Sequence, residues 1–143
     1  QDVSSFPLEE KVGAVVFRKE PRAIMFALVH DVFGYWTVAK GSPLEGEALE
    51  EAAARKVAEE TGLRATEVLQ QLGENEYAVY DPDKGNVRRH VTYFLLKTTD
   101  TKLQLGSKGG LNDVRWFAER ELKDLKIYDD VKEFFKKAIK IIG

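Results

Sequence analysis

The 143-residue sequence contains no cysteine, so it has no disulfide framework, no thiolate metal site and no cysteine nucleophile. It also lacks an apolar run of the roughly 20 residues that a membrane-spanning helix needs, and its first residues lack the basic and apolar regions of a signal peptide. With 22 basic and 24 acidic side chains the net charge is −2, which excludes a general attraction to nucleic acid. We therefore expect a cytoplasmic protein without membrane contact or an extended nucleic-acid surface, whose nucleotide affinity comes from a local site or a bound metal.

The length and the 43% share of hydrophobic residues suit one domain with a real core. Residues 1–10 are polar and are expected to form a loosely held arm, and the Gly-rich residues 98–110 a loop. Alternation, β-branched residues and apolar runs predict strands at 11–19, 23–30, 76–80, 86–97 and 113–118. Helical spacing predicts helices at 47–61, 119–125 and 128–142. This order predicts a single α/β domain over residues 1–143, with a mixed sheet between helices.

The stretch from Gly41 to Leu63, GSPLEGEALEEAAARKVAEETGL, reads as a loop that feeds a helix, with Gly62 at the position of a helix C-cap. At about 100° per residue, Lys56, Glu59 and Glu60 share an arc of roughly 100°. Paired carboxylates on one helix face favour a hard cation such as Mg²⁺, which uses one or two carboxylates together with substrate phosphates. The alternative is an ordinary solvated helix whose charges form i,i+4 pairs.

This stretch resembles the signature of the Nudix hydrolases, which is Gly, five residues, Glu, seven residues, then Arg-Glu-aliphatic-any-Glu-Glu-any-Gly-aliphatic. The matching positions are Gly41, Glu47, Arg55, Val57, Glu59, Glu60, Gly62 and Leu63. Lys56 stands where the family has glutamate, and the preceding YWTVAKG resembles the family's W-x-L-P-K-G. The resemblance implies the Nudix α/β/α sandwich. It also implies Mg²⁺- or Mn²⁺-dependent hydrolysis of a nucleoside diphosphate linked to a further group, most like the diadenosine tetraphosphate hydrolase and MutT-like branch.

The resemblance also implies roles for individual residues. Glu59 and Glu60 are implied as metal ligands beside the Gly41 backbone, Arg55 as the residue that orients the acidic cluster, and Glu47 as support for the loop. Lys56 has no acceptor atom and cannot bind Mg²⁺ while it is charged. Two interpretations stay open: either Lys56 holds a phosphate in place of one cation, or the site is a nucleotide-binding module without turnover.

Outside the signature, four residues are candidates for binding a small-molecule nucleotide substrate. Lys40 could reach a phosphate or could be solvated. Arg88, Arg89 and His90 follow one another on the return strand, and one outward pair, taken as Arg88 and His90, could neutralise a polyphosphate, or these residues could belong to a charged edge strand. Tyr80 could stack on a base, or could pack in the core.

Three further questions stay open from the sequence. Relatives acting on dinucleoside polyphosphates often carry an acid five residues before the last-strand tryptophan, where this chain has Leu111; nearby Asp113 is a candidate substitute, or a turn residue. Housecleaning of oxidised nucleoside triphosphates differs from the first hypothesis only in its substrate. Both a monomer and a homodimer are compatible with the sequence.

Overall fold

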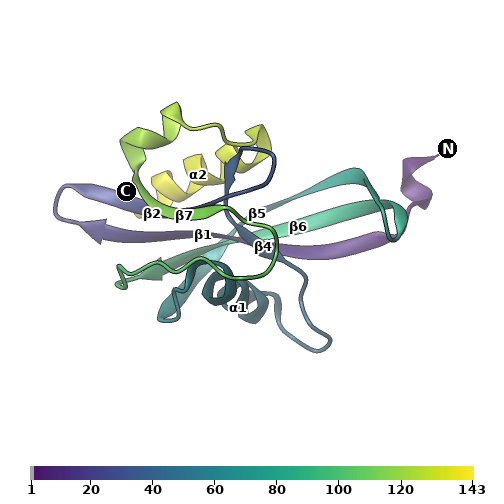
Figure 1. Ribbon diagram of the computed structural model, residues 1–143, viewed down its shortest axis with the longest axis horizontal. Helices are drawn as coiled ribbons and strands as arrows, with labels where there is room; N and C mark the ends of the chain where they lie inside the picture. The colour runs from purple at the N-terminus through teal and green to yellow at the C-terminus, as the bar shows by residue number, and fades with distance from the viewer. Residues whose placement is uncertain (1) are drawn as a thin grey trace.

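A computed structural model of the protein describes residues 2–143. One seven-stranded mixed sheet forms its centre, in the order β3-β2-β1-β6-β5, with β4 beside β1 and β7 beside β2 (Figure 1). The strands are β1 (Leu8–Glu20), β2 (Ala23–His30), β3 (Trp36–Thr37), β4 (Ala39–Gly41), β5 (Thr66–Asp81), β6 (Gly85–Thr98) and β7 (Asp113–Ala118). The pair of β1 and β6 is parallel, whereas the other strand pairs are antiparallel.

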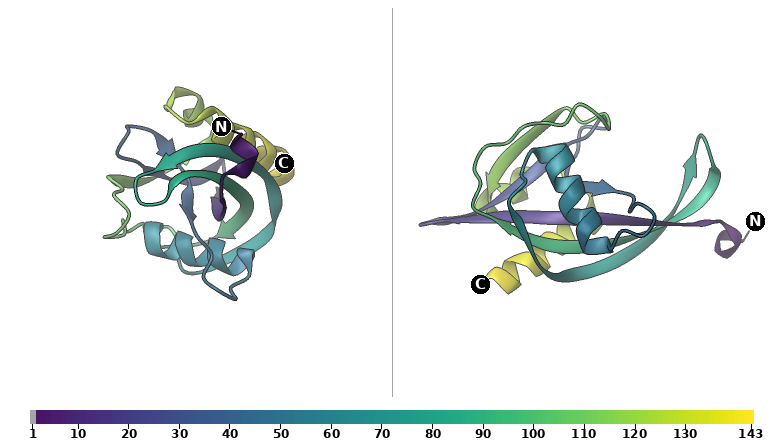
Figure 2. Two further views of the ribbon diagram at one scale, coloured as in Figure 1. Left: turned by 90° about the vertical axis from the view of Figure 1, so that its right-hand side faces the viewer. Right: turned by 90° about the horizontal axis from the view of Figure 1, so that it is seen from below.

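Two α-helices cover opposite faces of this sheet, α1 (Leu49–Thr61) and α2 (Asp129–Ile142), as Figures 1 and 2 show. Two short 3-10 helices, η1 (Val3–Ser5) and η2 (Glu119–Asp124), complete the regular structure of the described residues. The predicted α/β/α sandwich is therefore confirmed. Neither α-helix within residues 2–143 has the length and apolar character to cross a membrane.

The core has two layers because side chains alternate between the faces of the central strands. Between the sheet and α2 lie Val15, Phe17, Phe26, Leu28, Val91, Tyr93, Leu95, Val131, Phe134, Phe135 and Ala138. Between the sheet and α1 lie Val12, Ala14, Val16, Ala27, Ala39, Ala52, Ala53, Val57, Phe94 and Leu96. Where both faces of the sheet are covered, the strands read as continuous apolar runs, as at residues 12–17 of β1 and 93–96 of β6.

The expected loose arm at residues 1–10 is wrong for its second half. β1 begins at Leu8, which pairs with Arg88 of β6, and the Arg88 N–H donates to the Pro7 carbonyl at 2.8 Å. Main-chain pairing with a distant strand orders these residues, and their polar side chains give no sign of it. The arm also included Gln1, which lies outside the described residues.

The hairpin is longer than predicted, because β5 begins at Thr66 rather than at residue 76. Register shifts at Val68/Gln70 and Gln71/Gly73 interrupt its alternation, which hides the first half of the strand from a period-two pattern. The β5–β6 tip and the start of β1 extend away from the two helices (Figure 1). This extension supplies one wall of the site described below.

Local signals placed several boundaries correctly. The strands Ala23–His30 and Asp113–Ala118 have their predicted limits. Gly62 caps α1 with φ of 80°, and Gly85 turns the hairpin with φ of 81°, both in the left-handed region that glycine adopts without strain. The segment predicted as a helix over 119–125 is a 3-10 helix.

Gly13 allows a close approach between β1 and the Tyr93 ring of β6. A Cβ atom at this position would lie 2.7 Å from Cδ1 and Cε1 of Tyr93, whose fully buried ring stacks on Phe134 with 4.0 Å between ring centroids. We expect Gly13→Ala to lower the free energy of unfolding by about 1–3 kcal/mol, as overpacking does in tight cores, although alanine is otherwise favoured over glycine in a strand. Urea unfolding measures this change, and an unchanged midpoint would contradict the packing argument.

Candidate active site

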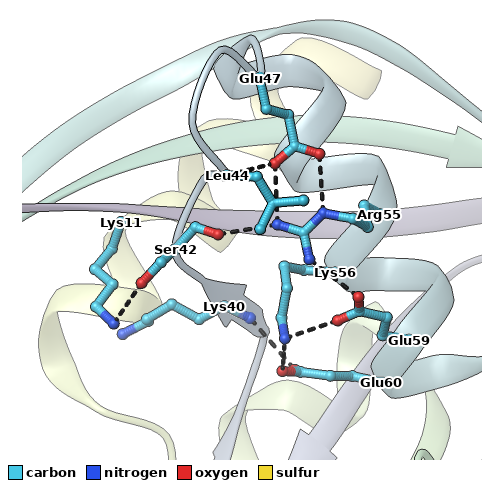
Figure 3. A network of polar contacts seen from close by, with 9 residues as sticks. All are labelled: Lys11, Lys40, Ser42, Leu44, Glu47, Arg55, Lys56, Glu59 and Glu60. Atoms are coloured by element: carbon cyan, nitrogen blue, oxygen red, sulfur yellow. Dashed lines mark hydrogen bonds and ion pairs between the residues drawn. The ribbon is translucent and has the colours of Figure 1, made fainter.

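Arg55 ties the loop before α1 to the helix itself. Its Nε and Nη2 atoms donate to the two Glu47 oxygens at 2.9 and 3.0 Å, and Nη2 also donates to the Ser42 carbonyl at 2.9 Å (Figure 3). Glu47 in turn accepts from the Leu44 N–H at 2.9 Å. The hydrogen bond to Glu47 raises the pKa of Arg55, and the same contact lowers the pKa of Glu47. The loop is thus held by a bidentate, charge-assisted pair.

The carboxylates of Glu59 and Glu60 converge on the Lys56 ammonium group (Figure 3). Lys56 Nζ lies 2.9 Å from Glu59 Oε2 and 3.6 Å from Glu60 Oε2, and Arg55 Nη1 donates to the other Glu59 oxygen at 3.0 Å. Hydrogen bonds from Lys56 and Arg55 lower the pKa of Glu59. Of the expected i,i+4 pairs, Arg55–Glu59 and Lys56–Glu60 exist. The expected pair of Glu51 with Arg55 is not formed, since Glu51 accepts from the Ala48 N–H at 3.2 Å and Arg55 turns to Glu47.

Glu60 lies deeper than Glu59, with 13% of its side chain exposed against 48%. Its Oε1 accepts a hydrogen bond from the Lys40 backbone N–H of β4 at 3.3 Å. Burial raises the pKa of Glu60, even though Lys56 acts in the opposite direction. This carboxylate therefore gains more than Glu59 from a cation that replaces its lost water.

Gly41 allows α1 to approach β4 at the site. A Cβ atom at Gly41 would overlap the Lys56 side chain, coming within 2.8 Å of its Cγ. The stem of Lys56 is thus packed against bare backbone, which directs its ammonium group toward the two carboxylates.

Two adjoining cavities border the carboxylates. The larger, of about 680 Å³, lies on the α2 side of the sheet, and the smaller, of about 410 Å³, lies beside α1. The larger is lined by Asp31, Phe33, Thr37, Val38, Lys40, Glu60, Tyr77, Val79, Arg89, Gly109, Leu111, Tyr128, Asp130 and Val131. The smaller is lined by Lys56, Glu59, Glu60, Ser107, Lys108 and Gly109. Because they share Glu60 and Gly109, one extended ligand could contact both.

Of the four predicted substrate residues, Lys40 alone lines the larger cavity. Its Nζ atom lies 6.0 Å from the centroid of the Tyr77 ring and 5.9 Å from the centroid of the Tyr93 ring. Burial lowers the pKa of Lys40; Asp130 and Asp31 act in the opposite direction, whereas Arg89 and Lys11 lower the pKa. A phosphate that entered the cavity would relieve this unfavourable burial of a cation.

The other three, Arg88, His90 and Tyr80, are not among the residues that line either cavity. Arg88 pairs with Glu76 at 3.3 Å. His90 lies between two carboxylates, Glu10 at 2.9 Å and Glu74 at 3.3 Å. The alternative of a charged edge strand is wrong, because β6 lies between β1 and β5 in the sheet, and the charges pair instead with side chains of these two neighbouring strands. Tyr80 is exposed.

Arg89 is the strand residue that faces the cavity instead. Residues of β6 alternate between faces, and Val91 and Tyr93 pack toward α2, so Arg89 points the same way while its neighbours point toward α1. It pairs with Glu9 and Asp81, both at 2.9 Å. Strand alternation in the sequence places Arg89 on the same face as Tyr93, but the tertiary structure decides that this face lines the cavity.

Asp113 does not line either cavity. Its carboxylate accepts from Arg115 at 2.7 Å and from the Val114 N–H at 2.8 Å, as a residue at a strand start does. Sequence reasoning missed Thr37, whose buried hydroxyl lines the larger cavity and has no hydrogen-bond partner among the described residues. Nothing in the local sequence marks it.

The carboxylates of Glu59 and Glu60 can bind one divalent cation only if the Lys56 ammonium group moves away from them. Within residues 2–143 no three His, Cys, Asp or Glu side chains are arranged to hold a metal. Mg²⁺, however, needs only one or two carboxylates when substrate phosphates complete its shell. Lys56 contacts both Glu59 and Glu60, so these carboxylates reach a common cation, provided that the ammonium group withdraws.

We therefore expect weak binding of Mn²⁺ in the absence of nucleotide, and at least tenfold tighter binding for Lys56→Gln. The substitution removes a positive charge a few ångströms from the cation, where Coulomb energies reach several kcal/mol at intermediate dielectric. Titration calorimetry with Mn²⁺ measures both affinities, and Lys102→Gln, an exposed lysine outside both cavities, is the matched control. Low-micromolar binding by the unsubstituted protein would contradict this expectation.

Comparison with known proteins places this geometry in context. The sequence profile of the NUDIX domain matches residues 7–138. The chain is 28% identical over 141 residues to a Mycobacterium tuberculosis protein provisionally named mutator protein MutT4, covering 95% of this chain and 50% of that protein. It is 26% identical over 156 residues to the RNA pyrophosphohydrolase of Novosphingobium aromaticivorans, covering 95% and 97%. The chain thus spans about half the length of the first relative and nearly all of the second.

Solved structures share the fold. The NUDIX domain of Shewanella oneidensis NrtR, complexed with ADP ribose, superposes with a TM-score of 0.75 at 20% identity, over 100% of this chain and 94% of that one. A C. elegans Ap4A hydrolase in a binary complex gives a TM-score of 0.73 at 21% identity, over 94% and 97%. At these identities the likeness shows the fold alone.

Proposed function

The chain belongs to the Nudix family, since the NUDIX profile covers residues 7–138, and we propose that it is a pyrophosphohydrolase of nucleoside diphosphate-linked substrates. Its substrates are dinucleoside polyphosphates or nucleoside triphosphates, and its cofactor is Mg²⁺ or Mn²⁺. Residues 1–143 act as a single Nudix domain. The names of two similar proteins, an RNA pyrophosphohydrolase and an Ap4A hydrolase, support this class of reaction.

The observation that carries the proposal is the convergence of Glu59 and Glu60 on one cation position between the two cavities. Arg55 fixes this arrangement by joining Glu47 of the loop to Glu59 of the helix. Arg55 and Lys56 contribute two positive charges against the three carboxylates. A single excess negative charge remains, so this site needs the phosphates of its substrate to hold a divalent cation well.

Different residues have different roles in the proposed reaction. Lys40 and Arg89 bind the phosphate chain in the larger cavity, and Glu59 and Glu60 hold the cation. A divalent cation held by these carboxylates would polarise a phosphoryl oxygen and make hydroxide available near neutral pH. Water attacks one phosphorus of the bridge, the bond from that phosphorus to the bridging oxygen breaks, and the leaving phosphate takes up a proton.

A second candidate function is nucleotide binding without turnover. The presence of Lys56 favours this alternative. Its ammonium group occupies the point on which both carboxylates converge and provides no acceptor for a proton from water. In this alternative the two cavities still bind a nucleotide, but a divalent cation does not increase the rate of its hydrolysis.

A steady-state assay separates the two functions. The protein is incubated with diadenosine tetraphosphate, ATP, an oxidised deoxyguanosine triphosphate or ADP-ribose, with Mg²⁺, Mn²⁺ or EDTA, and products are separated by chromatography. We expect turnover of at least one of the first three only in the presence of metal. Binding of nucleotide without turnover under any condition would establish the binding module instead.

A further inference from the structure

The segment between β6 and β7 is fastened to the C-terminal end of α1 by main-chain contacts. The Gln104 N–H donates to the Thr61 carbonyl at 2.8 Å, and the Gly106 N–H lies 3.3 Å from the Glu60 carbonyl. A Cβ atom at Gly106 would overlap the carbonyl oxygen of Glu59. Carbonyls at a helix end are unsatisfied and carry partial negative charge. The N–H groups of the segment satisfy carbonyls at the end of α1. This pairing also reduces the electrostatic repulsion between the helix end and a bound anion.

This attachment brings a second lysine to the metal carboxylates. Ser107, Lys108 and Gly109 form one wall of the 410 Å³ cavity, opposite Lys56, Glu59 and Glu60. Lys56 comes from α1 and Lys108 from a segment about fifty residues later in the sequence. Two lysines from distant parts of the chain therefore line the cavity beside the position where the proposed reaction places a diphosphate.

The Lys56 ammonium group has donor capacity left over. It carries three N–H groups and makes one hydrogen bond, to Glu59, with a longer ion pair to Glu60. Lys108 is exposed and has no salt bridge to an acidic side chain within residues 2–143. Ammonium groups bind phosphate as compact point charges.

We propose that Lys56 and Lys108 form a two-lysine site that binds a diphosphate group directly, without a divalent cation. This proposal rests on the proposed function for the class of ligand, but not for turnover. In this metal-free state Glu59 and Glu60 position the Lys56 ammonium group. The aliphatic part of the Lys56 side chain packs against Gly41. Gly106 serves as a positioning residue for Lys108.

Titration calorimetry in EDTA, with inorganic pyrophosphate and with ADP as probes, tests the proposal. We expect binding by the unsubstituted protein, and a loss of about tenfold or more for Lys56→Gln and for Lys108→Gln, since each substitution removes a positive charge and its hydrogen bond to the diphosphate. Gly106→Ala should weaken binding similarly without removing a charge, because the segment must move off α1. Lys102→Gln, on the same segment but outside the cavity, should leave the affinity unchanged. Thermal unfolding checks that each variant is folded.

The proposal is overturned if EDTA abolishes binding of both probes, or if folded Lys108→Gln binds them as tightly as Lys102→Gln does. Its outcome is separate from that of the proposed function. Binding in EDTA without turnover in Mg²⁺ supports the two-lysine site and refutes the hydrolase. Turnover in Mg²⁺ without binding in EDTA supports the hydrolase and refutes the two-lysine site.

Discussion

Replacing Lys56 by glutamate should raise Mg²⁺-dependent hydrolysis of dinucleoside polyphosphates on the order of 10²-fold. The change removes a positive charge 2.9 Å from Glu59 and 3.6 Å from Glu60. It also supplies an oxygen acceptor, and a general base typically contributes 10²–10⁴-fold. The fold should be unaffected, because glutamate and lysine have similar helix propensities and the site borders open cavities. The measurement is kcat/KM for diadenosine tetraphosphate in both proteins.

Lys56→Gln is the matched control for this experiment. It removes the charge but adds no base, so its rate should fall between those of the other two proteins. Equal rates for all three would mean that Lys56 does not limit the reaction and that the base lies elsewhere. In the metal-free titration the order should reverse, since Lys56→Glu places an anion where the two-lysine site needs a cation. One substitution thus moves two measurable properties in opposite directions.

Glu60→Gln should lower metal-dependent hydrolysis by about 10²-fold, measured in the unsubstituted and the Lys56→Glu backgrounds. Glu60 borders both cavities, and glutamine keeps the acceptor for the Lys40 N–H but loses the charge that holds a cation. Stabilisation by the cation amounts to several kcal/mol, and each 1.36 kcal/mol of barrier is tenfold in rate. Glu50→Gln, on the exposed first turn of α1, is the control and should retain full activity.

The stability of Glu60→Gln distinguishes a lost function from a lost fold. Burial raises the pKa of Glu60 in the folded protein, so the ionised form is disfavoured there relative to the unfolded chain. Ionised Glu60 therefore lowers the free energy of unfolding once the pH rises above the ordinary pKa of a glutamate. At pH 7 the neutral glutamine removes this effect, and the melting temperature should not fall. A marked fall in melting temperature, together with lost activity, would instead mean that Glu60 stabilises the fold through its ion pair with Lys56.

The family and the centre of the site could be predicted from the sequence because their determinants are close together along the chain. The signature spans residues 41–63, and helix geometry alone places residues three and four apart on one face. The contacts of Arg55 and Lys56 with Glu59 and Glu60 follow from that spacing. The αL cap at Gly62 is equally local, since it depends on a single φ angle.

The strands could be predicted where hydrophobicity has a regular period, and not where long-range pairing overrides it. The first residues of β1 are polar and are ordered by parallel pairing with β6, which no local pattern reveals. The register shifts in β5 interrupt alternation, so the strand appears shorter in the sequence than it is. Because a one-residue change in register exchanges the two faces of a strand, such errors also affect predicted sites.

The sequence by itself therefore determined the Nudix signature, its helix and the local charge pairs around Lys56. Only the tertiary structure decided which residues outside the signature join the site. It directed Arg89 rather than Arg88 or His90 into the larger cavity, because Val91 and Tyr93, the next residues on the same face of β6, pack toward α2. It also brought Lys108 to Lys56, because backbone of a distant segment fits against the end of α1 only where Gly106 has no Cβ. These placements depend on strand register and backbone approach between distant residues, which local sequence patterns do not encode.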